Sequence, residues 1–380
     1  MLYYLQHYWW LLVSLLGALF VFLMFVQGGQ SLLFTTAKSN EEKNLIINAL
    51  GDKWKLTFTT LVVFGGATFA SFPLYYSTSF GGAYWLWMAI LFLFVIQAVS
   101  FEYRNKAGNI LGARTYEIFL FLNGFLGTIL IGVAVGMFFT GGAFTMNKLS
   151  ILNETSRVIS QWSNGWHGLD ALANPFNLLL GIVIYLAAKT LGLLYIINQI
   201  EHQKLILKLR NQLKVTGLLF VILFIVLLIA LFTMKGYSVD PENSMITVVK
   251  NKYFINMTEL IWPAVLLLSG IILVLTGIGT AFYSKGKYSF YITGGGVVLS
   301  VWSLLICTAF NNTPFFVSHT DIQQSLTLYN SSSSEFTLKV MAYVSLFIPV
   351  VIAYILYVWR ALTKKGESKG EVSEADTYSY

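Results

Sequence analysis

Lys189 is the one formal charge that falls in the central part of a long apolar segment of this sequence. The segment starts at Asn174, Pro175 and Phe176. Asn174 can accept a backbone N–H as a helix N-cap, and Pro175 suits the first helical position because it has no N–H to lose. A helix from Pro175 to Asn198 would cover roughly the 30 Å of a bilayer's hydrocarbon core. Because a lysine inside such a helix costs roughly 2.5–3.5 kcal/mol on insertion scales, Lys189 is a candidate for an intramembrane polar role.

Residues that could ligate a redox cofactor avoid the predicted spans. The four histidines fall at interfaces or in loops: His7, His167, His202 and His319. The single cysteine, Cys307, allows neither a disulfide nor a cysteine-built metal site within one chain. Methionines in apolar helices far more often pack than ligate. The sequence therefore predicts no haem and no metal ion held by this chain's own side chains.

Acidic residues stop at the ends of the predicted spans. These residues are Asp52, Glu102, Glu117, Glu201 and Glu259. Proton transfer across a membrane generally needs carboxylates or histidines along the path. The sequence thus offers no acid near the membrane midplane that could be protonated.

Composition assigns the chain to the all-α, polytopic membrane proteins. Its 380 residues are 56% hydrophobic and 11% charged, with a mean hydropathy of +0.69, whereas a soluble domain has roughly a quarter charged residues. No arginine-rich block with interleaved aromatic residues suggests a nucleic acid partner. The first apolar segment, from about Tyr8, lacks a basic region before it and a clear cleavage site, so we interpret it as a retained span.

We predict about nine transmembrane helices from length and hydropathy. The candidate spans are Tyr8–Val26, Leu56–Tyr76, Tyr84–Ser100, Ile118–Thr140, Pro175–Asn198, Thr216–Met234, Leu260–Tyr283, Phe290–Phe310 and Leu338–Trp359. The outer loop 147–172, with Trp162, Trp166 and His167, is typical of an amphipathic helix at the interface. The charged tail is predicted to be disordered.

Basic residues are distributed unequally between the two sets of loops. One set holds 17 of the 24, namely Lys38, Lys43, Lys53, Lys55, Arg104, Lys106, Arg114, Lys204, Lys208, Arg210, Lys214, Lys285, Lys287, Arg360, Lys364, Lys365 and Lys369. The other set holds six: Lys148, Arg157, Lys235, Lys250, Lys252 and Lys339. By the positive-inside rule, the N-terminus lies outside and the C-terminus lies in the cytoplasm.

Several stretches in order along the chain resemble subunit II of the cytochrome bd-type quinol oxidases. Ser325–Met341 is similar to the segment before that family's last helix, and Phe101-Glu102-Tyr103-Arg104 to a motif after its third span. Further matches are Trp54, Gly65-Gly66-Ala67, Phe69-Ala70, Pro73, Asn174-Pro175-Phe176, Thr190, Gly192 and Tyr195. Trp54, Tyr103, Arg104, Asn174, Pro175 and Phe176 are the family-matched residues for which we expect a structural role.

The resemblance implies a larger, homologous partner, subunit I, that carries haems b and d and the quinol-binding loop. The implied reaction is quinol oxidation coupled to reduction of dioxygen to water in the cytoplasmic (inner) membrane, with a proton motive force arising from protons taken from the cytoplasm. The implied architecture is two four-helix bundles and a peripheral helix. We assign these to 1–140, 175–310 and 338–360, with an interfacial loop at 141–174, a polar loop at 311–337 and a cytoplasmic tail at 361–380. A small single-span subunit and a structural quinone or lipid are further candidate partners.

The chain also departs from that family's pattern. Gly28-Gly29-Gln30-Ser31 stands where many members have an Asp-Gly-Phe-Asp stretch, and Lys55 replaces an aspartate after the tryptophan. Gln97 replaces an arginine and, with Lys189, is a candidate for an intramembrane polar role. Asp52, Glu102 and Lys55 remain the candidates for the point where protons enter, against an ordinary role at solvated helix ends.

Two questions stay open from the sequence. Lys189 could snorkel to the inner headgroups, bond to a neighbouring helix, or act on a proton or a quinone. The alternative function is a secondary transporter, which would show paired helices interrupted by glycine or proline in corresponding halves. Pro73 and Pro349 do not form such a matched pair.

Overall fold

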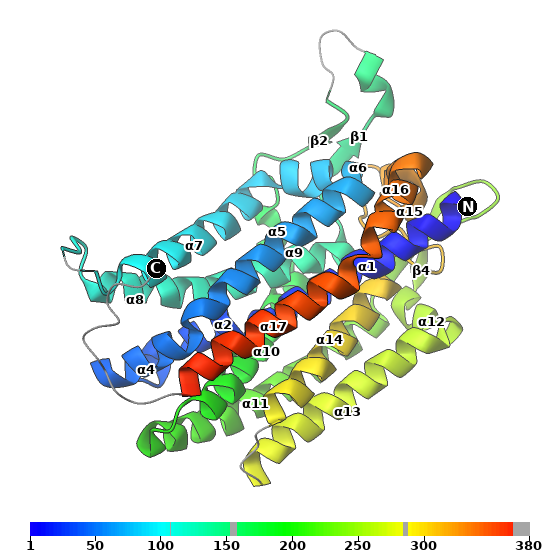
Figure 1. Cartoon of the computed structure of the whole chain (residues 1–380). Helices are drawn as coiled ribbons and strands as arrows, with labels where there is room; N and C mark the ends of the chain where they lie inside the picture. Colours follow the sequence, from blue (N-terminus) through cyan, green and yellow to red (C-terminus); the bar gives the residue numbers. More distant parts are fainter. Residues whose placement is uncertain (107, 153–157, 284–287, 368–380) are drawn as a thin grey trace. The chain divides into compact units, whose positions relative to one another are not determined.

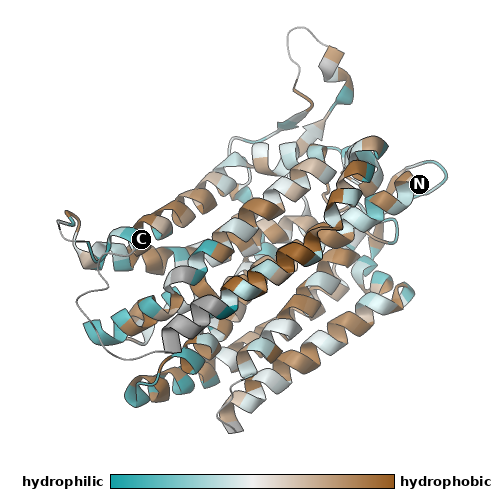
Figure 2. Ribbon diagram, viewed as in Figure 1, coloured by the Kyte–Doolittle hydropathy of each residue, from teal (hydrophilic) through white to brown (hydrophobic). Residues whose placement is uncertain are grey.

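The computed structural model describes residues 1–106, 108–152, 158–283 and 288–367. The chain divides into two compact units, Met1–Lys339 and Val340–Tyr380, and we describe each by itself. The first unit is built of long helices that run roughly alongside one another (Figure 1). Hydrophobic residues occupy the middle of these helices, and hydrophilic residues gather at their ends and in the loops (Figure 2).

The N-terminal apolar run forms three nearly continuous helices. These are α1 (Leu2–Leu23), α2 (Phe25–Gln30) and α3 (Leu32–Thr35). The run is thus longer than the predicted span Tyr8–Val26 because apolar and amide residues continue the helix on both sides. All six residues of α2 are buried.

The rest of the first half follows as a series of helices with interruptions. Its elements are α4 (Asn40–Leu50), α5 (Trp54–Ser71), α6 (Pro73–Tyr76), the π-helical turn η2 (Ser77–Gly81), α7 (Tyr84–Tyr103), α8 (Ala113–Leu122), the π-helical turn η3 (Asn123–Gly127) and α9 (Thr128–Thr140). Helix α5 ends just before Pro73, which cannot continue its backbone hydrogen bonding and instead begins α6.

The second half holds four long helices. They are α10 (Pro175–Gln199), α11 (Gln203–Thr233), α13 (Ile261–Tyr283) and α14 (Ser289–Cys307), with the short α12 (Lys252–Glu259) between them. Glycines allow close helix contact: a Cβ placed on Gly132 of α9 would lie 2.5 Å from Gly181 Cα of α10. A Cβ on Gly28 of α2 would overlap the Ala188 carbonyl of α10. Small residues at such contacts are typical of helix packing in membranes.

Two short β-hairpins and several single turns lie in the connections. Strand β1 (Phe144–Met146) pairs with β2 (Ser160–Trp162), and β3 (Lys235–Val239) pairs with β4 (Ile246–Lys250), both antiparallel. The remaining elements are η4 (Lys148–Leu152), η5 (Leu169–Ala173), η6 (Ile322–Gln324) and α15 (Leu328–Ser331). The amphipathic helix predicted for 147–172 is therefore wrong over its described part. Trp162 lies instead in β2 and donates to the Thr78 carbonyl at 2.8 Å.

Within the described residues, seven helices are long and apolar enough to cross a membrane. The bent pair α16 (Glu335–Ser345) and α17 (Ile348–Glu367), broken by 44°, makes an eighth if it is one span. The predicted second span, Leu56–Tyr76, is less apolar and corresponds to α5 and α6. The membrane-spanning all-α class is confirmed, while the count of nine and the division into two bundles stay predictions. Of the predicted disordered tail, 361–367 continues α17, and 368–380 lies outside the described residues.

Candidate functional site

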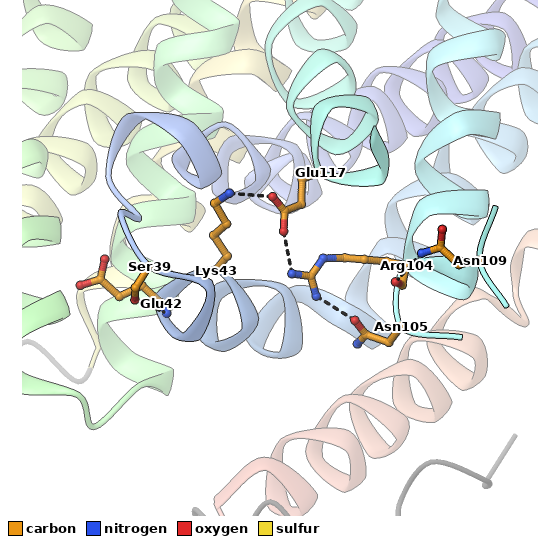
Figure 3. Close-up of polar contacts among 7 residues, drawn as sticks. All are labelled: Ser39, Glu42, Lys43, Arg104, Asn105, Asn109 and Glu117. Carbon is orange, nitrogen blue, oxygen red and sulfur yellow. Dashed lines mark hydrogen bonds and ion pairs between the residues drawn. The ribbon is translucent and has the colours of Figure 1, made fainter. Parts of the chain in front are cut away.

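The most concentrated charged site of the described chain is an ion cluster of Lys43, Arg104 and Glu117 (Figure 3). Glu117 accepts from Lys43 Nζ through one carboxylate oxygen and from Arg104 Nη2 through the other, each at 2.7 Å. Arg104 Nη1 donates to Asn105 Oδ1 at 2.9 Å. The glutamate and arginine side chains are buried, so both charges depend on each other and on these hydrogen bonds.

Three separate elements position the ion cluster. Lys43 comes from α4, Arg104 directly follows α7, and Glu117 lies in α8. The turn between α7 and α8 is held by Asn109, whose Nδ2 donates to the Arg104 carbonyl at 3.0 Å. The cluster therefore joins the end of α4 to the consecutive helices α7 and α8, from which α4 is distant in sequence.

A second ion pair adds α11 to this end of the bundle. Lys208 Nζ lies 2.5 Å from Glu42 Oε1. Glu42 also caps α4, because its other carboxylate oxygen accepts the Lys38 N–H at 2.8 Å while Ser39 Oγ accepts the Glu42 N–H at 3.2 Å. The hydrogen bond from Lys208, followed by that from Lys38, lowers the pKa of the Glu42 carboxyl below its ordinary value.

Two of the candidates for proton uptake, Glu102 and Lys55, lie exposed at the ends of α7 and α5. Glu102 pairs with Lys106 at 2.7 Å and both side chains are largely exposed. Lys55 is exposed as well. The side chain of Asp52 lies outside the described residues, although its backbone forms part of the 3₁₀ turn η1 (Gly51–Lys53).

The family-matched aromatic and capping residues have clear structural contacts. Trp54 stacks on Phe101 at 6.1 Å between ring centres, and Lys106 Nζ lies 4.8 Å from the centre of the Tyr103 ring. At the start of α10, Asn174 Oδ1 accepts the Phe176 N–H at 2.9 Å. The predicted N-cap of this helix is thus confirmed, with Pro175 at its first position.

The two intramembrane polar candidates lie in different surroundings. Gln97 of α7 is buried and its Oε1 accepts from Gln27 Nε2 of α2 at 2.9 Å. Lys189 of α10 is 8% exposed, and its ammonium lies 5.7 Å from the centre of the Tyr185 ring one turn earlier. This cation–π contact adds a fourth option to the three roles that the sequence left open.

A polar cluster also joins α12 to the loop that follows α14. Buried Lys252 donates to the Asn311 carbonyl at 2.8 Å, and Asn311 Nδ2 donates to Glu259 Oε2 at 2.6 Å. Burial lowers the pKa of the Lys252 ammonium, and the charge of Glu259 opposes that shift. The positive φ of Asn311, 58°, places its carbonyl on the lysine, and Asn tolerates this conformation better than most residues. These contacts hold the loop at Asn311 against α12.

The four histidines lie near helix ends or in loops, where each contacts a backbone group. His202 accepts the Leu205 N–H at 3.1 Å as the N-cap of α11, and His167 Nδ1 lies 3.2 Å from the Gly82 carbonyl. His7 and His319 likewise contact backbone carbonyls, those of Tyr3 and Thr140. In the described ranges no group of three or more His, Cys, Asp or Glu side chains is arranged to hold a metal ion.

An apolar cavity of about 30 Å³ lies among α1, α5, α7, α9 and α14. Its walls include Phe20, Phe64, Trp87 and Phe138. A space of this size has room for about two molecules the size of water, and its apolar lining offers almost no hydrogen-bond partner.

Sequence reasoning placed Glu117 only as an acid at a span end and missed its partners. It did not single out the buried amides Gln27 and Asn123, and it named Gln30 only as part of a departure from the family pattern. A signal was present, because amides inside an apolar run need partners from other helices, but the sequence does not say which helices supply them.

Long apolar helices in close glycine contact, with buried ion pairs at their ends, define a polytopic α-helical membrane protein whose internal polar groups stabilise helix packing. The family model described as cytochrome bd terminal oxidase subunit II matches residues 5–362, and the chain belongs to this family. The resemblance drawn from the sequence is confirmed. The family is that of a subunit of an oxidoreductase complex.

Curated relatives match over nearly their full length. The "cytochrome bd-I ubiquinol oxidase subunit 2" of Escherichia coli K12 is 26% identical, over 99% of this chain and 98% of the relative. The "probable cytochrome oxidase subunit 2" of Haemophilus influenzae is 26% identical, over 93% of each. A chain of the bd oxidase structure from Geobacillus thermodenitrificans aligns with a TM-score of 0.65 over 94% of this chain and 98% of that one. At 12% identity, that likeness concerns the fold.

Proposed function

We propose that this chain is the non-haem subunit II of a cytochrome bd-type terminal oxidase. In this role it supports a haem-bearing subunit I that oxidises quinol, reduces dioxygen to water and contributes to a proton motive force. The single observation that carries the proposal is the family match across residues 5–362. The secondary transporter, the other hypothesis from the sequence, has no comparable support.

The positions of the histidines and their hydrogen bonds support the assignment of haems b and d to the partner. Haem iron needs axial ligands that point into the bundle from the helices. Here His202 and His167 are bonded at the ends of helices and in loops. Electron transfer and dioxygen reduction are then supplied by the partner's haems, and this chain's own residues hold the helices that the partner packs against.

Binding partners other than subunit I belong to the same proposal. A small single-span subunit and a quinone or lipid with a structural role are candidates. Glu102, Asp52 and Lys55 remain candidates for proton uptake at the cytoplasmic side. Exposed Glu102 and Lys55 are accessible from solvent in this chain, which proton uptake requires.

The proposal is tested by purifying the complex through an affinity tag on this chain. A pyridine haemochrome spectrum should show haems b and d, and the complex should consume oxygen with a quinol as reductant. The same chain expressed without its partner should give no haem band in a reduced-minus-oxidised spectrum. A stoichiometric haem on the isolated chain would contradict the assignment, and His202 and His167 would be the first ligands to replace.

A further inference from the structure

Four uncharged amide side chains meet inside the first half of the bundle. They are Gln27 and Gln30 of α2, Gln97 of α7 and Asn123 of η3, which we call the amide cluster. Each is at most 1% exposed. Only one hydrogen bond links them within the described chain, from Gln27 Nε2 to Gln97 Oε1 at 2.9 Å.

Glycines in η3 bring α2 and α7 to the same place. A Cβ on Gly124 would lie 2.5 Å from the Gln27 carbonyl oxygen and 3.1 Å from Gln30 Cβ, so α2 approaches η3 directly. A Cβ on Gly127 would lie 3.2 Å from Asn123 Nδ2 and 4.0 Å from Leu93 Cβ of α7. The π-helical turn therefore places Asn123 between the two helices, and such turns are frequent at functional sites.

The amide cluster leaves polar atoms without protein partners in the described chain. Three amide nitrogens are unpaired: Gln30 Nε2, Gln97 Nε2 and Asn123 Nδ2. Three amide oxygens are unpaired as well: Gln27 Oε1, Gln30 Oε1 and Asn123 Oδ1. Buried amides in native proteins almost always have a hydrogen-bond partner, because a buried polar group without a hydrogen bond costs free energy.

The equal number of donors and acceptors identifies the chemistry of the missing partner. A cation would satisfy only the oxygens, and an anion or a carbonyl compound would satisfy only the nitrogens. Water satisfies both and typically makes about three hydrogen bonds when buried. The balance does not depend on how each amide is oriented. Exchanging oxygen and nitrogen in both Gln27 and Gln97 leaves one unpaired donor and one unpaired acceptor as before.

From this geometry we infer that the amide cluster is a binding site for a small group of ordered water molecules within the membrane-spanning bundle. The site is neutral, since its four members carry no titratable group. None of the hydrogen bonds described for the ion cluster reaches a member of the amide cluster. The bound water completes the hydrogen bonding of α2, α7 and η3 and so holds these elements together where their own side chains fall short.

The first test is the assembled complex itself, imaged by cryo-electron microscopy at a resolution that resolves ordered water. We expect density within hydrogen-bond distance of both Gln30 and Asn123, with three or four partners in water-like geometry. Density with five or six oxygen neighbours, which changes when sodium is exchanged for potassium, would overturn water in favour of a cation. The water site would be excluded if the four amides were hydrogen-bonded to one another and no density lay between them.

A solution measurement on the unaltered complex keeps the inference testable without any variant. X-ray hydroxyl-radical footprinting labels buried side chains that touch bound water. Leu93 and Asn123 both lie beside Gly127, since a Cβ built there would be 4.0 Å from Leu93 Cβ and 3.2 Å from Asn123 Nδ2. Leu304 of α14 is a matched control because it and Leu93 are both 7% exposed. We expect Leu93 to be labelled several-fold faster than Leu304, and equal rates would contradict a water site.

A variant pair then assigns the water to the amides. Asn123→Leu and Gln30→Met keep side-chain volume and remove the polar atoms. In assembled complex, infrared bands of buried water that shift with oxygen-18 water should be lost in the double variant. Bands that persist unchanged in assembled double variant would show that the water does not bind at these amides.

Discussion

Arg104 and Glu117 form an ion pair of 2.7 Å in which the two side chains are only 5% and 3% exposed. Lys106 and Glu102 form another pair of 2.7 Å, one turn apart, with 53% and 44% of their side chains exposed. The two contacts are equal in length and differ in their surroundings. Because a buried charge that loses its partner cannot turn to solvent, the two pairs should respond differently to the same substitution.

We predict that Glu117→Gln lowers the stability and the yield of the assembled complex. The change leaves Arg104 and Lys43 with no acid between them, and breaking a buried pair by removing one partner costs about 3–5 kcal/mol. Thermal unfolding of the purified complex measures the effect. Glu102→Gln is the matched control, with little expected change in Tm because its pair is solvent-exposed. Equal losses in the two variants would contradict the argument.

Gly28→Ala should prevent the close approach of α2 to α10. The new methyl group would overlap the Ala188 carbonyl, and overpacking of this kind costs about 1–3 kcal/mol or more. Gly295→Ala in α14 is the control, since a Cβ there has no atom within 4 Å. That variant should assemble as the unaltered chain does, measured as complex yield per membrane protein. The prediction is wrong if both variants assemble equally.

Because of the ion pair of Glu42, the stability of the folded complex should decrease as the solution becomes acidic. Its pKa is lowered in the folded chain by the hydrogen bond from Lys208, so the pair stabilises the fold above the ordinary pKa of about 4.3. This contribution is lost as the pH falls through the lowered pKa. Glu42→Gln should therefore have a lower Tm than the unaltered complex at neutral pH. The gap should close below about pH 4, and a gap that is constant with pH would oppose the prediction.

Lys189→Met should retain quinol-dependent oxygen uptake per haem and normal assembly. The ammonium has no hydrogen-bond acceptor among the described residues, and methionine keeps much of the stem that packs beside Tyr185. Lys189→Arg should assemble less well, since the planar guanidinium is larger in a buried position. Lost turnover in fully assembled Lys189→Met would instead establish a role toward a proton or a quinone.

The distribution of basic residues predicts an outward N-terminus and a cytoplasmic C-terminus. A fluorescent protein fused to the C-terminus should be bright in cells, and alkaline phosphatase at the same position should be inactive. The opposite pattern would exclude a cytoplasmic C-terminus and with it this topology.

The sequence by itself determined the membrane class, most of the spanning segments, the N-cap at Asn174 and the family. Each of these depends on residues that are close in the chain or on a pattern summed along it. Hydropathy over a helix length and a capping side chain beside its helix act locally, so tertiary contacts were not needed.

The tertiary structure decided which polar side chains meet. Lys43 reaches Glu117 across 74 positions, and Gln27 reaches Gln97 across 70. Neither pairing has a local signal, because each depends on which helices pack together and on the rotation of each about its axis. The same holds for the break between α2 and α3 and for the hairpin β1–β2 in place of a predicted helix. In these places packing between distant segments outweighs local preference, and only the folded chain reveals it.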